Sequence, residues 1–304
     1  MSKMDFISRA VIERPFRRLG RAALLDRLHA VRALAAVRGV RYLDEAGHVR
    51  LIDIALKPWL LTRVQLRAFH HVAMQMASAL LRLVELRAAV PAIRAIIPLE
   101  PEHERWFELA THPTARPLAV MGRFDSTATY DHARWHREFR MLEPNAVGVG
   151  GVFYAPTACS ILWDVVGDLL QAALPGRRLA PTPDPRQLLV AELQALAHRL
   201  RTPVRGVALI ENTDFTTGTD EFQALAAYLS DHGINAVVAD PRQLRLVRGE
   251  LVAGRTRVDL LYRDSELAEF VEMERGGHRL TALRQAVRQG RLISGLTWEL
   301  DQKS

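Results

Sequence analysis

Two short segments of the chain carry pairs of polar residues whose spacing suits a shared site. Arg123 and Asp125 stand in the segment MGRFD, with one residue between them. Glu143 and Asn145 stand in MLEPN with the same spacing. Because side chains alternate along a strand, both members of each pair project from the same face of an extended segment. If the two segments pair as a hairpin, one guanidinium, two carboxylates and one amide converge.

These four groups suit the binding of magnesium and phosphate. Mg²⁺ prefers oxygen ligands and is usually held by one or two carboxylates together with phosphate oxygens and water. Asp125, Glu143 and Asn145 supply oxygen atoms of that kind. The guanidinium of Arg123 would neutralise charge on a transferring phosphoryl group, where preorganised cations act strongly.

Glycines follow the second segment directly. Gly148, Gly150 and Gly151 would allow the backbone to approach a phosphate closely. An exposed hairpin with Arg–Asp and Glu–Asn pairs across its strands shows the same pattern, so the spacing alone leaves a purely structural role open.

The elements that must position these groups begin with a largely helical region, residues 1–174. A short apolar stretch at 49–55 predicts a strand, and residues 117–155 predict a β-hairpin with a long polar loop. The clearest helix begins at Thr62, which forms a capping-box pattern with Gln65 ahead of apolar residues at steps of three and four. We therefore expect this region to be α+β.

The remainder of the chain has an alternating pattern. Residues 175–185 contain four prolines and predict a linker. In residues 186–304, the segments VRGVALIE, INAVVAD and VDLLYRD predict strands, GELVAG predicts a short turn, and residues 219–231 predict a helix that ends before Gly233. Strands that alternate with helices are typical of a mostly parallel sheet, so we expect an α/β fold overall.

The charge pattern does not indicate a nucleic-acid partner. The chain of 304 residues has a net charge of +7, and its arginines are densest over 14–41, where their spacing predicts one amphipathic helix with a basic outer face. Base-stacking aromatic residues and known nucleic-acid motifs are absent from that stretch. Walker A, HExxH, GxSxG and CxxC patterns are absent from the whole sequence.

The sequence also sets expectations about location. Cys159 is the single cysteine, so an intrachain disulfide is impossible and an oxidising compartment is not indicated. The first residues lack the apolar core of a secretory signal, and no run approaches 18 apolar residues. We expect a cytoplasmic protein without a membrane span, and no heptad or other pattern indicates its oligomeric state.

The segments with the paired residues resemble the circularly permuted ATP-grasp ligases, which include the glutathionylspermidine synthetase-like family. The resemblance rests on GRFD, on the hydrophobic strand that ends in Glu143 and Asn145, and on Gly150, Gly151 and Tyr154 after it. It extends over roughly residues 60–304. In that family the carboxy half of the ATP-grasp module precedes a Rossmann-like pre-ATP-grasp domain, and a lid that holds the nucleotide comes last.

The resemblance implies a domain order and an activity. Residues 1–174 would hold helices and the metal-binding half of the ATP-grasp module, and 186–304 would form the Rossmann-like substrate domain. The implied activity is that of an ATP- and Mg²⁺-dependent ligase, in which a small-molecule or peptide carboxylate becomes an acylphosphate that an amine attacks.

The resemblance also implies roles for individual residues. The metal ligands would be Asp125, Glu143 and Asn145, the catalytic residue would be Arg123, and Gly150 and Gly151 would contact the nucleotide. Arg263, at the end of VDLLYRD, is a candidate contact for the substrate carboxylate, although a surface ion pair explains a strand-end arginine equally well.

Two departures from the family pattern affect these expectations. The gap between Asp125 and Glu143 is long and contains His132 and His136, which we interpret as part of a polar loop. The sequence ends at DQKS, so Lys303 would be the first nucleotide contact of a lid segment that does not follow. We expect an incomplete ligase fragment that is inactive alone, with a non-catalytic binding or scaffold protein of the same fold as the alternative.

Overall fold

The computed structural model describes residues 6–44, 46–112, 121–127, 129–147, 149–214 and 219–300. The chain divides into two compact units. The first comprises Met1–Met76, Phe124–Glu143 and Gly151–Asp184. The second comprises Ala77–Arg123, Pro144–Gly150 and Pro185–Ser304. The last crossing between the units thus lies at the end of the proline-rich segment.

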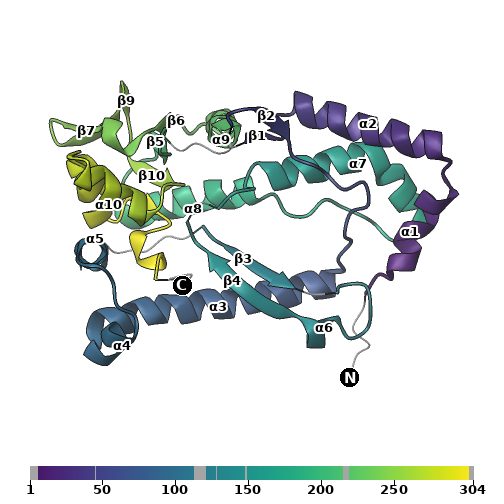
Figure 1. Cartoon of the computed structure of the whole chain (residues 1–304), viewed down its shortest axis with the longest axis horizontal. Coiled ribbons are helices and arrows are strands. Elements are labelled where there is room, and N and C mark those ends of the chain that lie inside the picture. Colours follow the sequence, from purple (N-terminus) through teal and green to yellow (C-terminus); the bar gives the residue numbers. More distant parts are fainter. Residues whose placement is uncertain are drawn as a thin grey trace. The chain divides into compact units, whose positions relative to one another are not determined.

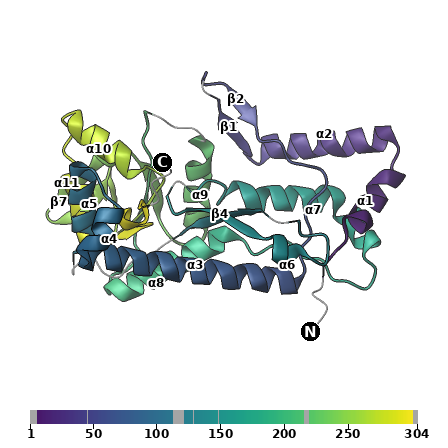
Figure 2. The ribbon, with the colours of Figure 1, turned by 60° about the horizontal axis from the view of Figure 1, so that its bottom comes forward.

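The first unit is built mainly from helices. Its elements are α1 (Arg9–Arg18), α2 (Arg21–Val37), the first half of α3 (Arg63–Ala89), α6 (Trp135–Glu138) and α7 (Tyr154–Ala173), together with the antiparallel strands β1 (Arg41–Leu43) and β2 (Val49–Leu51). Figures 1 and 2 show α2 lying along α7. Apolar residues of α1 and α2 pack with the apolar stripe of α7 to form the core, among them Ile12, Phe16, Val31, Ile161 and Val166.

The prediction of one continuous basic helix over 14–41 is wrong. Leu19 and Gly20 adopt extended backbone angles and separate α1 from α2, consistent with the low helix propensity of glycine. The basic face is also only partly exposed to solvent. Arg27 and Arg38 pair with Asp168 and Asp164 of α7, with N to O distances of 3.1 and 2.6 Å. These arginines therefore hold α2 against α7.

The predicted capping box at the start of α3 is confirmed. The backbone N–H of Gln65 donates to Oγ1 of Thr62 at 3.2 Å, and the backbone N–H of Thr62 donates to Oε1 of Gln65 at 2.9 Å. The amide nitrogen of the buried Gln65 side chain also donates to the carbonyl of Tyr130 at 2.7 Å. The side chain of Gln65 therefore caps the start of α3 and also holds the loop that contains Tyr130.

The predicted hairpin is also confirmed, but its loop contains aromatic side chains as well as polar ones. The strands β3 (Arg123–Thr127) and β4 (Arg140–Asn145) pair with each other (Figure 1). Between them, the rings of Tyr130, Trp135 and Phe139 lie 5.2 to 5.5 Å from the ring of Phe69 on α3. Such aromatic contacts anchor the loop. His132 lies in the same loop and bonds Glu138 at 3.0 Å, from Nε2 to Oε2.

The second unit contains a parallel sheet of four strands, which confirms the predicted α/β class. The strands are β5 (Val207–Ile210), β6 (Ala236–Ala239), β10 (Leu260–Arg263) and β11 (Leu292–Ile293), in the spatial order β11-β10-β5-β6. All four residues of β5 and of β10 are buried. Strands buried on both faces are typical of a parallel sheet with helices on each side.

Helices cover both faces of this sheet. On one face, α9 (Thr219–Asp231) places the ring of Phe222 5.7 Å from that of Tyr262, and α8 (Pro185–Leu200) packs beside α9. On the other face, α5 (Pro101–Thr111), α10 (Leu267–Arg275) and α11 (Thr281–Arg288) share one core with Ala208, Ile210 and Leu261. Figure 2 shows these three helices gathered together. The remaining helix, α4 (Pro91–Ile96), is short.

A small antiparallel sheet lies between β6 and β10 in the sequence. It consists of β7 (Leu244–Val247), β8 (Glu250–Ala253) and β9 (Thr256–Arg257), where the sequence predicted only a short turn. Arg248 and Gly249 join β7 to β8 with φ angles of 52° and 81°. Two consecutive positive φ angles are the signature of a type I′ hairpin turn, which matches the twist of paired strands.

In the part of the chain that the structure describes, no helix is both long and apolar enough to cross a bilayer.

A buried ion pair makes a testable contribution to the second unit. Arg87 is fully buried, pairs with Glu104 at 2.6 Å and lies 4.5 Å from the centroid of Phe107. Arg87→Ala leaves the partly buried carboxylate of Glu104 with only the more distant Arg94, at 4.0 Å, so we expect a loss of about 3 kcal/mol in the free energy of unfolding by urea. Arg82→Ala is the matched control, because Arg82 is 67% exposed in its pair with Glu85. Equal losses of unfolding free energy in the two variants would contradict a stabilising role of the buried Arg87–Glu104 pair.

Candidate functional site at the carboxyl edge of the parallel sheet

The strand order places a switch point between β5 and β10. The first strand in the chain is β5, the second is added on one side of it as β6, and the chain then returns to add β10 and β11 on the other side. The connections from β5 and β10 therefore leave the sheet in different directions. In open parallel sheets, ligands bind outside the carboxyl ends of the strands at such a point.

A row of three carboxylates stands at this edge. Arg263 is opposite Ile210 in the register, and the next backbone bond, from the N–H of Asp264 to the carbonyl of Ile210 at 2.9 Å, places Asp264 beside Glu211. On the other side, the N–H of Glu211 donates to the carbonyl of Ala239 at 3.1 Å, which places Glu211 beside Asp240. Three adjacent strands thus end in acidic residues.

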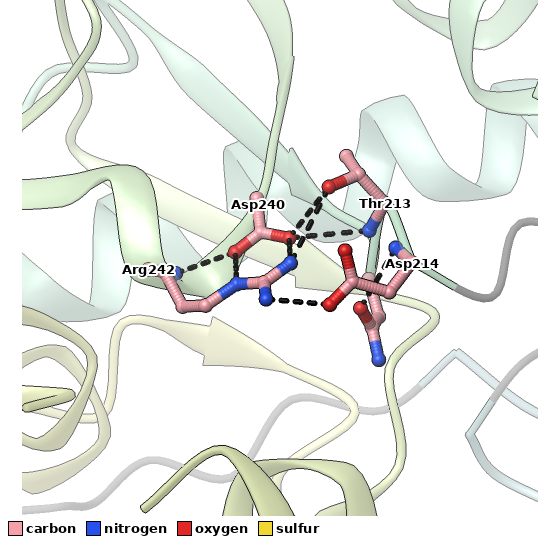
Figure 3. A network of polar contacts seen from close by, with 5 residues as sticks. Thr213, Asp214, Asp240 and Arg242 are labelled. Atoms are coloured by element: carbon pink, nitrogen blue, oxygen red, sulfur yellow. Dashed lines mark hydrogen bonds and ion pairs between the residues drawn. The ribbon is translucent and has the colours of Figure 1, made fainter. Parts of the chain in front are cut away.

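Asp240 is neutralised within the protein. Its carboxylate accepts from Nε and Nη2 of Arg242 at 2.7 and 2.6 Å and from the backbone and hydroxyl of Thr213 at 3.1 and 2.9 Å (Figure 3). Burial raises the pKa of Asp240, but the hydrogen bonds from Arg242 and Thr213 outweigh it and lower the pKa to about 2. Arg242 also bonds Asp214 at 2.5 Å. The network therefore ties the loop after β5 to the loop after β6.

Glu211 and Asp264 lack this compensation. Burial, followed by repulsion from Asp264 and Glu221, raises the pKa of Glu211 to about 7. Burial and repulsion from Glu221 raise the pKa of Asp264 to about 6. Glu211 is only 7% exposed, and no arginine or lysine among the described residues pairs with it. This part of the edge favours a proton or a bound cation.

Arg263 lies beneath the edge, fully buried. Its Nε donates to the carbonyl of Ser294 at 2.7 Å, and its Nη1 donates to the carbonyl of Ser265 at 2.8 Å and to Glu299. Within the described residues its Nη2 has no hydrogen-bond partner. Most of the guanidinium therefore braces the ends of β10 and β11, and the role of Arg263 as a contact for the substrate carboxylate stays a prediction.

Ser294 connects the sheet to the segment that leads into β3. Its side chain is completely buried, and its Oγ donates to the carbonyl of Met121 at 2.8 Å and accepts from the N–H of Met121 at 3.4 Å. Ser294 has a φ of 58°, a left-handed conformation that costs a non-glycine residue energy. Met121 precedes Arg123 by two residues, so this contact places the start of β3 at the edge.

The structure places the predicted site residues on two paired strands. Arg123 and Asp125 share one face of β3, and Glu143 and Asn145 share one face of β4, because alternate residues of a strand point the same way. The Nη1 of Arg123 donates to the carbonyl of Gly150 at 3.0 Å. The pairing brings the two strands together as the sequence suggested, and the metal role of this set stays a prediction.

Some of the predicted nucleotide contacts lie in the described part of the chain. Gly151 has a φ of 91°, which favours glycine, and its role in binding a nucleotide stays a prediction. Gly148 and Lys303 lie outside the described residues. Among the described residues, no three of His, Cys, Asp and Glu gather to hold a metal ion. The predicted set has only two carboxylates and one amide, so an ion bound there would need further ligands.

Glu211, Asp264 and Ser294 are not among the site residues expected from the sequence. A signal for the first two was present, because each strand segment ends in an acid: ALIE, VVAD and LLYRD. That signal shows where each acid stands along the chain. It does not show which strands are neighbours, and only the order β10-β5-β6 makes the three acids a row.

Comparison with known proteins reveals a similar fold and no match in sequence. No protein-family model matches the chain, and no curated protein matches it. Among solved structures, the fold is similar to that of a glutathione synthetase-like effector from Globodera pallida in its apo form, with a TM-score of 0.59 and 11% sequence identity. The match covers 97% of this chain and 66% of that chain, so this chain spans just under two thirds of that protein.

This likeness concerns the fold alone. It agrees with the α/β class. The circular permutation and the membership of a particular ligase family, which the sequence suggested, stay predictions.

The raised pKa of Glu211 predicts how stability changes with pH. The folded state holds a proton on Glu211 up to about pH 7, whereas the ordinary glutamate value is 4.5, so the folded state binds more protons between these values. The free energy of unfolding should therefore fall as the pH rises through this window, by an amount on the order of 2 kcal/mol.

Glu211→Gln tests this assignment. The variant should be more stable than the wild type at pH 8 and should show a flatter dependence between pH 5 and 8 in urea denaturation. Glu272→Gln is the control, because this side chain is 68% exposed in its pair with Arg275 and should leave the dependence unchanged. A stability that rises with pH through the window would contradict the assignment.

The Ser294 contact predicts an order among substitutions. Ser294→Ala removes both hydrogen bonds to the buried backbone of Met121, so we expect a loss of about 1–3 kcal/mol. Ser294→Gly removes the same bonds but relieves the positive φ, so its loss should be smaller by about 1 kcal/mol. Urea denaturation measures both losses, and hydrogen exchange at the Met121 amide should increase in both variants. If Ser294→Gly and Ser294→Ala lose the same unfolding free energy, the positive φ at this position stores no strain.

Proposed function

We propose that this chain forms part of an ATP- and Mg²⁺-dependent ligase that joins a carboxylate to an amine, with a circularly permuted ATP-grasp arrangement. The glutathione synthetase-like fold supports the class of protein. The residues of β3 and β4 support the chemistry. The whole reaction, including the acylphosphate intermediate and the nucleotide contacts, is part of this proposal.

The observation that carries the proposal is the pairing of β3 with β4. Asp125 and Glu143 stand on adjacent strands, and each shares its strand face with a second polar residue of the predicted set. All but Arg123 are half-buried, an environment where carboxylates interact strongly with cations. A solvated surface hairpin does not require a carboxylate and an amide in that setting.

The donor set fits magnesium and other hard cations. Asp125, Glu143 and Asn145 offer only oxygen atoms, which hard cations prefer over the nitrogen and sulfur ligands typical of zinc. An ion with so few protein ligands takes the rest from phosphate and water, as Mg²⁺ commonly does in nucleotide sites. When bound, the ion would offset negative charge on the phosphates of ATP.

Arg123 would act on the group being transferred. Its guanidinium already donates to the carbonyl of Gly150, so its position is fixed before any ligand binds. A preorganised cation stabilises developing charge without the cost of reorienting during the reaction. The planar fork also suits phosphate and carboxylate oxygens better than an ammonium group does.

The sheet edge, which lies within the second unit, would bind an amine as its ammonium ion. Glu211 is buried beside Asp264, so a bound cation would offset the cost of charging these carboxylates.

The proposal is tested by metal binding. Mn²⁺ replaces Mg²⁺ in many nucleotide sites and is followed by electron paramagnetic resonance, here with Mn²⁺ alone, so that the test does not depend on nucleotide contacts outside the β3–β4 set. Asp125→Asn and Glu143→Gln should each weaken Mn²⁺ binding by at least about tenfold, because each removes a ligand charge. Melting temperatures should stay nearly unchanged.

Glu85→Gln serves as the control for this test. Glu85 is 51% exposed in a surface pair with Arg82, so its substitution should leave Mn²⁺ binding unchanged. If the wild type binds no Mn²⁺, or if the two hairpin variants bind it like the wild type, the ligase assignment fails and a binding or scaffold role is favoured.

A further inference from the structure

The first unit contains a cavity that the proposed function does not use. Its volume is about 110 Å³, and its apolar walls come from α1, from the segment before α3 and from the loop between β3 and α6. The apolar lining residues are Ile7, Ile12, Pro58, Trp59, Leu60 and Tyr130.

The aromatic wall of this cavity is fixed in place without a ligand. The rings of Trp59 and Tyr130 meet edge to face, with centroids 5.8 Å apart and planes at 85°. Tyr130 is held in turn by the bond from Gln65 to its carbonyl and by its ring contact with Phe69 at 5.2 Å. Trp59 remains 58% exposed. A large aromatic surface that is both positioned and open to solvent is preorganised for an apolar partner.

The rim of the cavity is electropositive. Glu13 accepts from Nε of Arg9 at 2.7 Å, from Arg17 at 2.6 Å and from Lys57 at 3.3 Å. These hydrogen bonds lower the pKa of Glu13 to about 2, so its carboxylate is charged. Asp131 is the other acidic residue in the lining. All three cations bond Glu13, although Arg17 lies outside the lining. With Asp131 included, these five groups carry a formal charge of +1.

Two of these cations keep donors for another anion. Among the described residues, Arg9 uses only its Nε, and Lys57 makes only the bond to Glu13. The side chains are 63% and 47% exposed, so a ligand can reach them. An arginine fork is well suited to a carboxylate.

The volume limits the size of the ligand. A drug-sized molecule or a nucleotide needs a pocket of roughly 300 Å³ or more, whereas an apolar cavity of about 150 Å³ binds one benzene ring. The cavity volume of about 110 Å³ is below both values, so at most a single ring can enter it, and part of that ring would stay exposed at the open side. The charged part of such a ligand would remain at the rim.

We propose that this cavity binds a small aromatic carboxylate, with the ring against Trp59 and Tyr130 and the carboxylate at Arg9 and Lys57. The proposal does not depend on the ligase assignment, because it uses none of the residues of β3, β4 or the sheet edge.

Titration with phenylacetate tests the proposal, followed by two-dimensional ¹H–¹⁵N NMR of the full chain. A ligand of about ten non-hydrogen atoms at moderate efficiency should bind with a Kd on the order of 1 mM, and the indole resonance of Trp59 should shift. Phenylacetamide, which has the same shape without the charge, should bind at least about fivefold more weakly. Phenethylamine should bind more weakly still. Equal affinity for the acid and the amide would overturn the carboxylate assignment.

Three variants locate the binding. Trp59→Ala should weaken phenylacetate binding by at least about tenfold, and Lys57→Gln by at least about threefold, while Trp163→Ala should leave it unchanged. Trp163 is the matched control, a 38% exposed tryptophan on α7 that does not line the cavity. Wild-type affinity in both Trp59→Ala and Lys57→Gln, or no binding by the wild type, would overturn the proposal.

Discussion

The register of β5 against its two neighbours is the constraint on which the candidate site depends. It continues one residue beyond the strands, through the backbone bonds from Asp264 to Ile210 and from Glu211 to Ala239. This extension brings acidic residues of three strands to one edge of the sheet. Buried carboxylates are costly, so the protein must neutralise them or hold protons on them. It does both: Arg242 neutralises the carboxylate at the end of β6, and burial favours the protonated forms of the other two.

The same edge also organises the chain beyond the sheet. Ser294 bonds both backbone groups of Met121 and has a left-handed φ at the end of β11. Its carbonyl accepts from the buried guanidinium of Arg263. A strained residue held by buried hydrogen bonds on both sides is a feature that functional sites commonly retain, since the surrounding structure must stabilise it.

Local features of this fold could be predicted from the sequence, and features that depend on distant partners could not. The capping box of Thr62 and Gln65 involves two residues three positions apart, so the sequence was sufficient to locate it. The break at Gly20 was missed because arginine spacing suggested a solvated face, whereas Arg27 and Arg38 face acids on α7, more than 120 positions later. The acidic residues at the sheet edge could not be grouped from the sequence for the same reason, because long-range packing decides which strands are neighbours. The types and spacing of Arg123, Asp125, Glu143 and Asn145 were enough to locate β3 and β4. They did not show whether these residues bind a metal.

The two candidate sites illustrate how the surroundings of a carboxylate decide what it can bind. Glu13 is held by three cations, so its charge is fully compensated and the excess donors attract a second anion. Glu211 is buried beside other acids without a described cation, so it attracts a proton or an ammonium group. Composition cannot distinguish these cases, since both are glutamates in a basic protein. The difference comes from the partners that the fold places around each side chain, and it gives the two sites opposite ligand preferences.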